Sequence, residues 1–345
     1  MRILLFADVH WSASSSITTR FGSNYTTRLE MLLRSMNWVN ETAIKENCSM
    51  MICAGDMMDK SNCSDIELTA LADIQWNNLP CYFLCGNHES SDASLRFSTV
   101  KCLETKNHII ITSPKIVKLD EANQELELCF LPYVVECDRK PLIDYFGEKL
   151  EYKRVIISHN DIAGINYGPV ISKTGFSLDE IESNADLFLN GHIHNSEFIS
   201  EKILNLGSLS AHNFSNDSLN YKYGCWILDT DTLKLDFIEN PYAYNFYKLQ
   251  VDCESDILCL EKLKNNAVIS VKCEQSLVEK VKQKIATLDN IIESRIILIR
   301  HFADATEASQ ELDLTVDHLA RFVECCKANL ECSALVEEEL AQICK

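Results

Sequence analysis

Five short polar motifs, built from histidine, aspartate and asparagine, each directly follow an apolar run. They are Asp8-Val9-His10, Gly55-Asp56-Met57-Met58-Asp59, Gly86-Asn87-His88-Glu89, Ser158-His159 and Gly191-His192-Ile193-His194. One such motif alone is weak evidence, because a histidine beside an aspartate is common in proteins. Together the motifs contain five of the nine histidines, at positions where exposure on a solvated surface explains them poorly.

These residue types suit a centre that holds two metal ions. Two divalent cations about 3.5–4 Å apart can share one carboxylate and neutralise charge on a phosphoryl group. A mixed set of imidazole, carboxylate and amide ligands favours manganese or a similar transition metal over calcium. Alternate residues of an extended segment point the same way, so Asp8 with His10, and His192 with His194, can each direct two ligands at one site. Glycine in three of the motifs permits sharp turns at strand ends.

The segments that carry the motifs alternate between buried strands and helices. Residues 3–7 form a continuous apolar run, typical of a strand buried on both faces. Residues 27–45 place their apolar side chains on one helical stripe. Further strands are predicted at 50–54, 80–85, 108–112, 126–132, 154–158 and 186–190, a helix at 65–76 and a hairpin across 223–239. The polar motifs therefore fall at the carboxyl ends of strands, where open α/β sheets bind ligands.

The predicted organisation is an α/β domain over residues 1–240, a small α+β domain over 241–303 and a helical arm over 304–345. The Asn240-Pro241 step marks the first boundary. The elements expected in the small domain are strands at 245–252, 268–273 and 295–301 and a helix at 276–288. The acidic last segment is either a helical hairpin packed on its own domain or an amphipathic arm that docks a partner.

The formal net charge of −19 argues against a protein that grips DNA with its whole surface. Bound cations would reverse the sign of the field locally, and a partner subunit could supply basic surface. The 16 cysteines include no C-x-x-C pair with zinc-site spacing, so we interpret them as reduced thiols of a cytoplasmic protein. No apolar run approaches the ~20 residues that span a bilayer. The first apolar run stops at Asp8, which indicates a strand and not a signal peptide.

The five motifs, in this order, resemble the signature of the calcineurin-like metallophosphoesterases. The resemblance implies a four-layer fold, in which a β-sandwich is flanked by helices. It also implies two metal sites that share Asp56. The first ion would be held by Asp8, His10, Asp56 and His194, and the second by Asp56, Asn87, His159 and His192.

By the same resemblance His88 would not bind metal but would face the scissile phosphate and protonate the leaving oxygen. Asp59 lies three residues after Asp56. Its carboxylate could hydrogen-bond His88, fix the tautomer of that ring and raise its pKa. The alternative is that Asp59 is a carboxylate at a helix N-terminus, satisfied by backbone amides.

Further features resemble one branch of the family, the SbcD-type nucleases. Protein phosphatases share two of the motifs but continue the first of them with Arg-Gly, where this chain has Lys60-Ser61. The nuclease branch opens with R-I-L-x-x-A-D-x-H, as this chain does, and carries a Gly-Ser loop after its last motif. The matching segments are Leu131-Pro132-Tyr133, Gly207-Ser208-Leu209 and the hairpin turn at 229–232. The short length and Asp59 point to phage members of the branch.

This resemblance implies a DNA nuclease that uses two divalent cations, with manganese expected and magnesium as the alternative. It implies 3′-to-5′ exonuclease activity on duplex ends and endonuclease activity on single strands and hairpins. The implied partners are DNA, an SbcC-type SMC-like ATPase and a second copy bound through the nuclease domain, with no membrane association. Arg20 is a candidate to touch DNA, although it could equally lie in a solvated loop. The alternatives are a phosphomonoesterase or protein phosphatase of the same fold, or a scaffold subunit that has lost catalysis.

Overall fold

The computed structural model describes residues 1–13, 24–121, 124–167, 170–214 and 221–299. Arg20 and the predicted arm at 304–345 lie outside the described residues. Among the helices of the described ranges, none combines the length and apolar character that crossing a bilayer requires.

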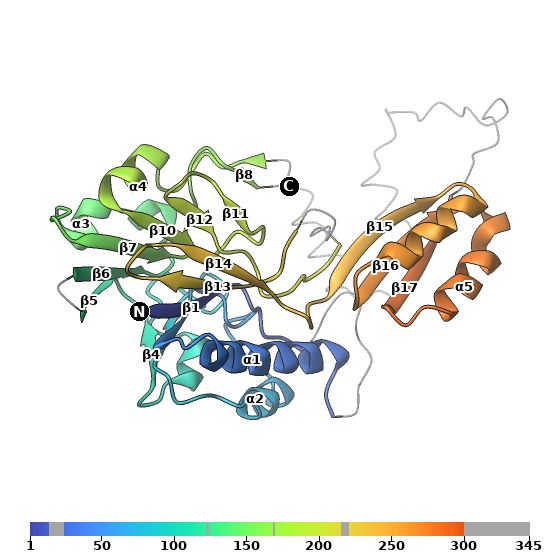
Figure 1. Cartoon of the computed structure of the whole chain (residues 1–345), viewed down its shortest axis with the longest axis horizontal. Helices are drawn as coiled ribbons and strands as arrows, with labels where there is room; N and C mark the ends of the chain where they lie inside the picture. Colours follow the sequence, from blue (N-terminus) through green and yellow to red (C-terminus); the bar gives the residue numbers. More distant parts are fainter. Residues whose placement is uncertain (14–23, 122–123, 168–169, 215–220, 300–345) are drawn as a thin grey trace, which may run out of the picture. The chain divides into compact units, whose positions relative to one another are not determined.

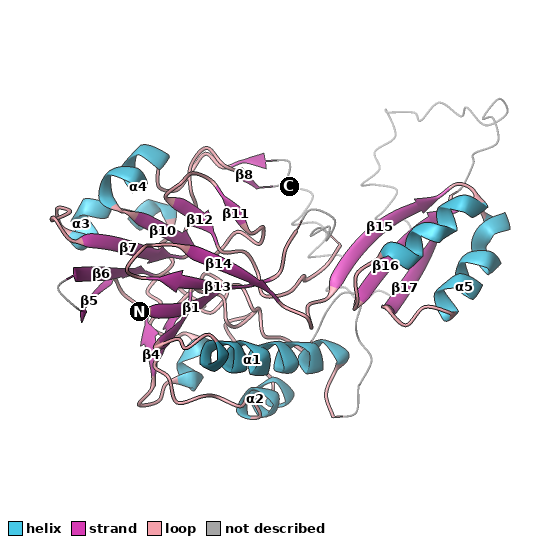
Figure 2. Ribbon diagram, in the orientation of Figure 1, coloured by secondary structure: helices cyan, strands magenta, loops and turns pink. Residues whose placement is uncertain are grey.

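Two six-stranded sheets form the larger part of the described chain (Figure 1; Figure 2). The first sheet has the order β14 (Leu235–Glu239), β13 (Gly224–Asp229), β1 (Arg2–Phe6), β2 (Met50–Cys53), β3 (Cys81–Leu84) and β4 (His108–Ile111). The second has the order β11 (Glu197–Phe198), β12 (Ile203–Asn205), β10 (Leu187–Asn190), β7 (Lys153–Ser158), β6 (Gln124–Leu131) and β5 (Lys115–Glu121). The four strands β1 to β4 pair in parallel, as do β12, β10, β7 and β6. Their carboxyl ends therefore share an edge within each sheet.

The alternation of side chains along each strand explains why the two sheets pack face to face. In β1, Leu5 faces a core that also holds Phe130 of the second sheet, whereas Phe6 faces the opposite core, which holds the helix residue Leu32. A third core lies on the outer face of the second sheet and includes Ile156. Three apolar layers thus join four layers of secondary structure, and the predicted α/β sandwich flanked by helices is confirmed.

Four helices cover the outer faces of the sheets, α1 and α2 on the first and α3 and α4 on the second (Figure 1). Their bounds are α1 (Thr27–Lys45), α2 (Asp65–Ala72), α3 (Leu142–Phe146) and α4 (Leu178–Asn184). The helix predicted at 65–76 ends earlier, because the backbone amide of Gln75 donates to the Asn37 side chain at 2.9 Å and leaves the helical path. Short elements connect these parts: β8 (Asn166–Tyr167), β9 (Val170–Ile171), η1 (Thr99–Leu103) and η2 (Glu136–Asp138).

A third, wholly parallel sheet follows in the chain, in the order β15 (Asn245–Val251), β16 (Ala267–Cys273) and β17 (Ile291–Leu298). It packs with η3 (Glu254–Lys262), η4 (Gln275–Leu277) and α5 (Val278–Ala286) around a core of its own. The α+β character expected of this segment is present. The strand predicted at 295–301 begins at Ile291, because the chain pairs with Ala267 from that residue onward.

Candidate metal centre

The motif residues gather where β1, β2 and β3 of one sheet and β7 and β10 of the other end. Four of them adopt left-handed backbone conformations, with φ of 51° at Asp8, 48° at His10, 50° at Asp56 and 74° at His192. Such conformations cost non-glycine residues about 1–3 kcal/mol each and concentrate at functional sites. The strand ends therefore bend sharply to direct these side chains inward.

The motif glycines are required by close packing around His159 and Asp56. A Cβ atom on Gly55, whose φ is +99°, would lie 2.1 Å from Nδ1 of His159. One on Gly86 would lie 2.1 Å from Oδ1 of Asp56, and one on Gly191 would lie 2.2 Å from a backbone oxygen. No side chain can occupy these positions without displacing a candidate ligand or the strand beside it.

The second predicted metal site is assembled around His159. Its Nδ1 lies 2.8 Å from the carbonyl oxygen of Ala54, which can accept a hydrogen bond and so places the proton on Nδ1. Its Nε2 is 3.2 Å from Oδ2 of Asp56 and 3.2 Å from Oδ1 of Asn87. His192 places Nδ1 3.0 Å from the same Asn87 oxygen and Nε2 3.2 Å from Oδ1 of Asp161. The structure thus brings together the four residues predicted for this site.

Charge interactions follow from this arrangement. Burial alone would raise the pKa of Asp56, but His159 beside it holds that pKa well below its usual range. Burial would likewise lower the pKa of His159, whereas the Asp56 carboxylate raises it to about 9. The pair therefore favours a negative carboxylate at the centre of the site, which is the state that binds cations.

The first predicted metal site is assembled around His10. Its Nε2 lies 3.1 Å from Nε2 of His194 and 3.8 Å from a carboxylate oxygen of both Asp8 and Asp56. Asp8 is fully buried, and its Oδ1 accepts a hydrogen bond from the backbone amide of His192 at 3.1 Å. Its Oδ2 is buried and accepts no hydrogen bond from the described residues. Burial also lowers the pKa of His194 to about 3, so this ring is neutral and can offer a lone pair.

These donor sets fit a pair of divalent cations. Candidate ion-binding groups of His10, Asp56 and His88, and of Asp8, Asp56 and His159, overlap at the Asp56 carboxylate. The uncompensated Asp8 oxygen and the converging imidazole nitrogens are what a cation would satisfy. The metal-ligand roles remain predictions from the sequence, and the structure places every one of the predicted side chains within the cluster.

His88 and Asp59 meet in a different way from the one predicted. The backbone amide of His88 donates to Oδ1 of Asp56 at 3.0 Å, and its side chain is exposed. Nδ1 of His88 lies 3.0 Å from the backbone carbonyl of Asp59, whereas the Asp59 carboxylate lies 3.3 Å from Nδ1 of His10. The expected contact between the Asp59 carboxylate and His88 is therefore corrected, because the turn presents its carbonyl to His88 and its side chain to His10.

Glu89, which follows His88, is fully buried and its carboxylate binds the backbone of two of the motif turns. Its carboxylate accepts hydrogen bonds from the backbone amides of Met58 at 3.0 Å and Gly86 at 2.7 Å. It therefore ties the turn after β2 to the turn after β3, which are the turns that carry Asp56 and Asn87. Burial, together with the charge of Asp56, raises the pKa of Glu89 to about 7.

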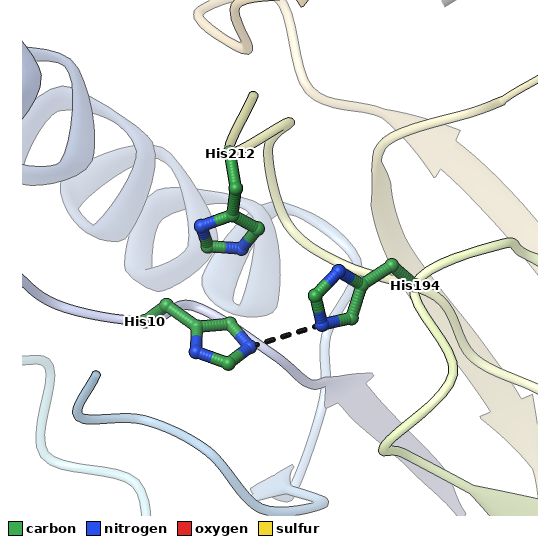
Figure 3. A group of neighbouring side chains, drawn as sticks. All are labelled: His10, His194 and His212. Atoms are coloured by element: carbon green, nitrogen blue, oxygen red, sulfur yellow. Dashed lines mark hydrogen bonds between the residues drawn. The ribbon is translucent and has the colours of Figure 1, made fainter. Parts of the chain in front are cut away.

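Two further residues belong to the cluster and were missed in the sequence. The ring of His212 packs edge-on against that of His10, with ring centroids 4.3 Å apart (Figure 3). The ring centroids of His212 and His194 are 5.0 Å apart. Arg28, at the start of α1, is buried and donates from Nη2 to Nδ1 of His212 at 2.8 Å. The one sequence signal was a histidine shortly after the Gly207-Ser208-Leu209 loop.

Burial sets the charge states of this added pair. It lowers the pKa of Arg28 to about 10, so the guanidinium stays charged at neutral pH. Burial, with the neighbouring His10 and Arg28, holds the pKa of His212 well below its usual range. Nη1 of Arg28 and Nε2 of His212 make no hydrogen bond within the described ranges. A buried donor left without an acceptor costs about 1–3 kcal/mol, so these two atoms mark a place where an acceptor is expected.

Comparisons with known proteins agree with the geometry. The model of the calcineurin-like phosphoesterase family matches residues 1–196. The probable exonuclease subunit 1 of Escherichia phage T5 is 23% identical over 363 residues, which cover 94% of this chain and 99% of that protein.

Solved structures give weaker likenesses. A dimetal phosphatase from Danio rerio is 10% identical, with a TM-score of 0.38 over 66% of this chain and 91% of that chain. A phosphoesterase from E. coli is 14% identical, with a TM-score of 0.32 over 70% of this chain and 100% of that chain. The family model, in contrast, spans more than half of the sequence and ends just beyond His192 and His194. With the motifs, the sandwich and the clustered ligands, that match shows that this chain belongs to the calcineurin-like phosphoesterase family.

Proposed function

We propose that this chain is the nuclease subunit of a two-metal DNA-processing complex of the SbcCD type. Its reactions would be 3′-to-5′ exonuclease cleavage at duplex ends and endonuclease cleavage of single strands and hairpins, with manganese as the ion. The observation that carries the chemistry is the position of Asp56. Its Oδ2 lies 3.2 Å from Nε2 of His159 and 3.8 Å from Nε2 of His10, so one carboxylate joins both ligand groups.

Two bound cations would neutralise charge on the phosphoryl group and hold it in place. His88 lies against the predicted ligand His10, with ring centroids 4.7 Å apart, and its side chain is exposed while its backbone amide donates to Asp56. The Asp59 carbonyl accepts from Nδ1 of His88, so Nε2 is the nitrogen presented to the substrate. In the protonated ring, Nε2–H would pass its proton to the leaving oxygen as water attacks the phosphorus and the P–O ester bond breaks.

The choice of DNA as substrate is supported by the phage relative, whose similarity extends through nearly the whole chain and not only the family domain. The description of that protein as an exonuclease subunit favours a nuclease that works in an assembly. The net charge of −19 favours a partner that supplies basic surface, which an SMC-like ATPase would do. A homodimer through the nuclease domain, DNA contact by Arg20 and docking by the arm at 304–345 belong to the same proposal.

The test is hydrolysis by the purified chain in manganese of two substrates in parallel, an end-labelled DNA duplex and p-nitrophenyl phosphate. Asp56→Asn serves as the inactive control, because it replaces the carboxylate near both ligand groups with a neutral amide. DNA degradation by wild type alone, with negligible monoester turnover, is the expected result. Monoester turnover without DNA cleavage would overturn the nuclease proposal in favour of a phosphomonoesterase. The order in which labelled nucleotides are released gives the polarity.

A further inference from the structure

Arg28 and His212 join the centre from α1 and from the loop after β12, and the resemblance assigns neither of them a role. Arg28 donates from Nη2 both to Nδ1 of His212 at 2.8 Å and to the backbone oxygen of His10 at 3.1 Å. The buried guanidinium of Arg28 thus joins the backbone of His10, a predicted metal ligand, to the imidazole of His212. Figure 3 shows the His212 ring directed at the place where the rings of His10 and His194 meet.

The contact with Arg28 fixes which nitrogen of His212 carries the proton. A guanidinium has five N–H donors and no acceptor, so Nδ1 of His212 must accept through its lone pair. A doubly protonated ring could not make this contact. The neutral ring therefore carries its hydrogen on Nε2, the nitrogen remote from Arg28.

This tautomer excludes Nε2 of His212 as a metal ligand, although the residue lies in a candidate ion-binding group with His10 and His194. A protonated imidazole nitrogen has no lone pair to give to a cation. It is instead a hydrogen-bond donor that is buried and makes no hydrogen bond with the described part of the chain. Burial lowers the pKa of His212 and outweighs the raising influence of the Asp8 backbone carbonyl, so the ring is neutral.

The pair offers more than one donor to the same neighbourhood. Nη1 of Arg28 is likewise buried without an acceptor among the described residues. The two residues both contact His10: Nη2 of Arg28 donates to its backbone oxygen, and the His212 ring lies edge-on to its ring, with centroids 4.3 Å apart. The His10 ring in turn lies 3.8 Å from carboxylate oxygens of Asp8 and Asp56. Positive and neutral N–H donors at the border of a cation site match an anionic oxygen, and the anion that a phosphoesterase admits there is the phosphate ester.

We propose that His212 donates from Nε2 to a non-bridging oxygen of the substrate phosphate and that Arg28 is the positioning residue that fixes this tautomer. The inference rests on the proposed function only through the class of substrate, a phosphate ester. It adds a phosphate contact from the protein that is independent of both metal ions. It applies equally if the substrate is not DNA.

The tautomer can be measured without any activity. Long-range ¹H–¹⁵N NMR spectra of the imidazoles, with His212→Gln used for assignment, distinguish a protonated from an unprotonated ring nitrogen. Nε2 of His212 is expected to be protonated and Nδ1 unprotonated in wild type, and Arg28→Met should mix the two tautomers. Arg28→Lys, which can still donate to Nδ1, should restore the wild-type pattern. A proton on Nδ1 in wild type would overturn the proposal.

The phosphate contact is tested with inorganic phosphate as the probe, measured as an inhibitor of bis(p-nitrophenyl) phosphate hydrolysis in manganese. His212→Ala should weaken phosphate inhibition about tenfold or more, the loss expected for a hydrogen bond to a charged group. His212→Gln, which can place an amide donor near the position of Nε2, should recover part of the loss. The manganese affinity of both variants, from calorimetry, should stay within about threefold of wild type, because a protonated Nε2 offers no lone pair to a cation.

The neighbouring residue His194 provides the matched comparison. His194→Ala should lose manganese affinity, because this ring is a predicted ligand, whereas His212→Ala should lose phosphate affinity. Loss of manganese by His212→Ala would make His212 a ligand, and unchanged phosphate inhibition would exclude the contact. Failure of wild type to cleave DNA would refute the nuclease proposal while leaving these measurements valid, because they use a small diester and phosphate.

Discussion

The two halves of the metal centre are built differently. Around His159 the ring is held by the Ala54 carbonyl on one nitrogen and by Asp56 and Asn87 on the other, with glycines packed against it. Around His10, by contrast, several polar atoms have no hydrogen-bond partner among the described residues, including Oδ2 of Asp8 and Nε2 of His212. In the half around His159, the backbone fixes the position of the ring without a bound ion. The half around His10 instead has hydrogen-bond donors and acceptors that cations and substrate would satisfy.

Replacing Gly55 should give the largest effect, because it removes the backbone support of the preset half. Gly55→Ala would place a methyl group 2.1 Å from Nδ1 of His159 at a φ of +99°. We expect manganese binding to be lost, kcat/KM to fall by about 100-fold or more and stability to fall by about 2–4 kcal/mol. Calorimetry, steady-state kinetics and thermal unfolding measure the three quantities.

Gly164→Ala is the matched control for that variant. Gly164 also has a positive φ, +85°, but a Cβ there meets no atom within 4 Å. It should lose about 1–2 kcal/mol of stability from backbone strain and keep its metal and activity. Equal activity of the two variants would contradict the view that His159 is preset by packing.

His88 lies against the half around His10, with ring centroids 4.7 Å apart, and His88→Asn tests whether it is a metal ligand there. We expect cleavage to fall by about 100-fold or more, because the proton donor to the leaving oxygen is removed. Manganese affinity should be nearly unchanged, since the ring is exposed and is held through the Asp59 carbonyl. Loss of an ion in calorimetry would instead make His88 a ligand, in line with its grouping with His10 and Asp56.

The contrast between the halves also marks what could be predicted from the sequence. The strands and the helix at 27–45 were predictable because long apolar runs and a single helical stripe encode burial locally. The motif residues could be placed together because the carboxyl ends of parallel strands meet. The contact between Arg28 and His212 joins residues 184 positions apart, and no local pattern marks it.

Asp59 shows a second limit of the sequence. Its spacing from Asp56 placed it beside His88, and its backbone carbonyl does contact that ring. The direction of its carboxylate depends on a side-chain rotamer and on the buried His10, neither of which the spacing encodes. Strand β5 was likewise not predicted, because Lys115–Glu121 mixes charged and apolar residues at the edge of a sheet.

A manganese titration should separate the two halves by affinity. Preorganised ligands lose less freedom on binding, so the half around His159 should fill first, about tenfold more tightly than the half around His10. Asn87→Ala should remove the tighter class of sites, because the Asn87 oxygen contacts both His159 and His192. A single class of sites in wild type, or loss of the weaker class in Asn87→Ala, would refute the difference drawn from the geometry.

The smallest effects are expected from the two carboxylates that orient a histidine in each half. The carboxylate of Asp59 lies 3.3 Å from Nδ1 of His10, and that of Asp161 lies 3.2 Å from Nε2 of His192. The ring of His10 is 2% exposed and that of His192 is 19% exposed, so water screens the second contact more than the first. Asp59→Asn should therefore weaken one class of manganese site about tenfold, and Asp161→Asn should weaken the other about threefold.

Calorimetry on the two variants checks both the size of each loss and the class that it affects. In Asp59→Asn the manganese sites of the weaker class should lose affinity. The backbone carbonyl that contacts His88 is kept, so the rate of cleavage at saturating manganese should stay close to that of wild type. A large fall in that rate with unchanged metal affinity would mean that the carboxylate acts on His88 during catalysis. That result would restore the role first expected for Asp59, as the partner of His88. It would also mean that the Asp59 carboxylate does not set the manganese affinity of the half around His10.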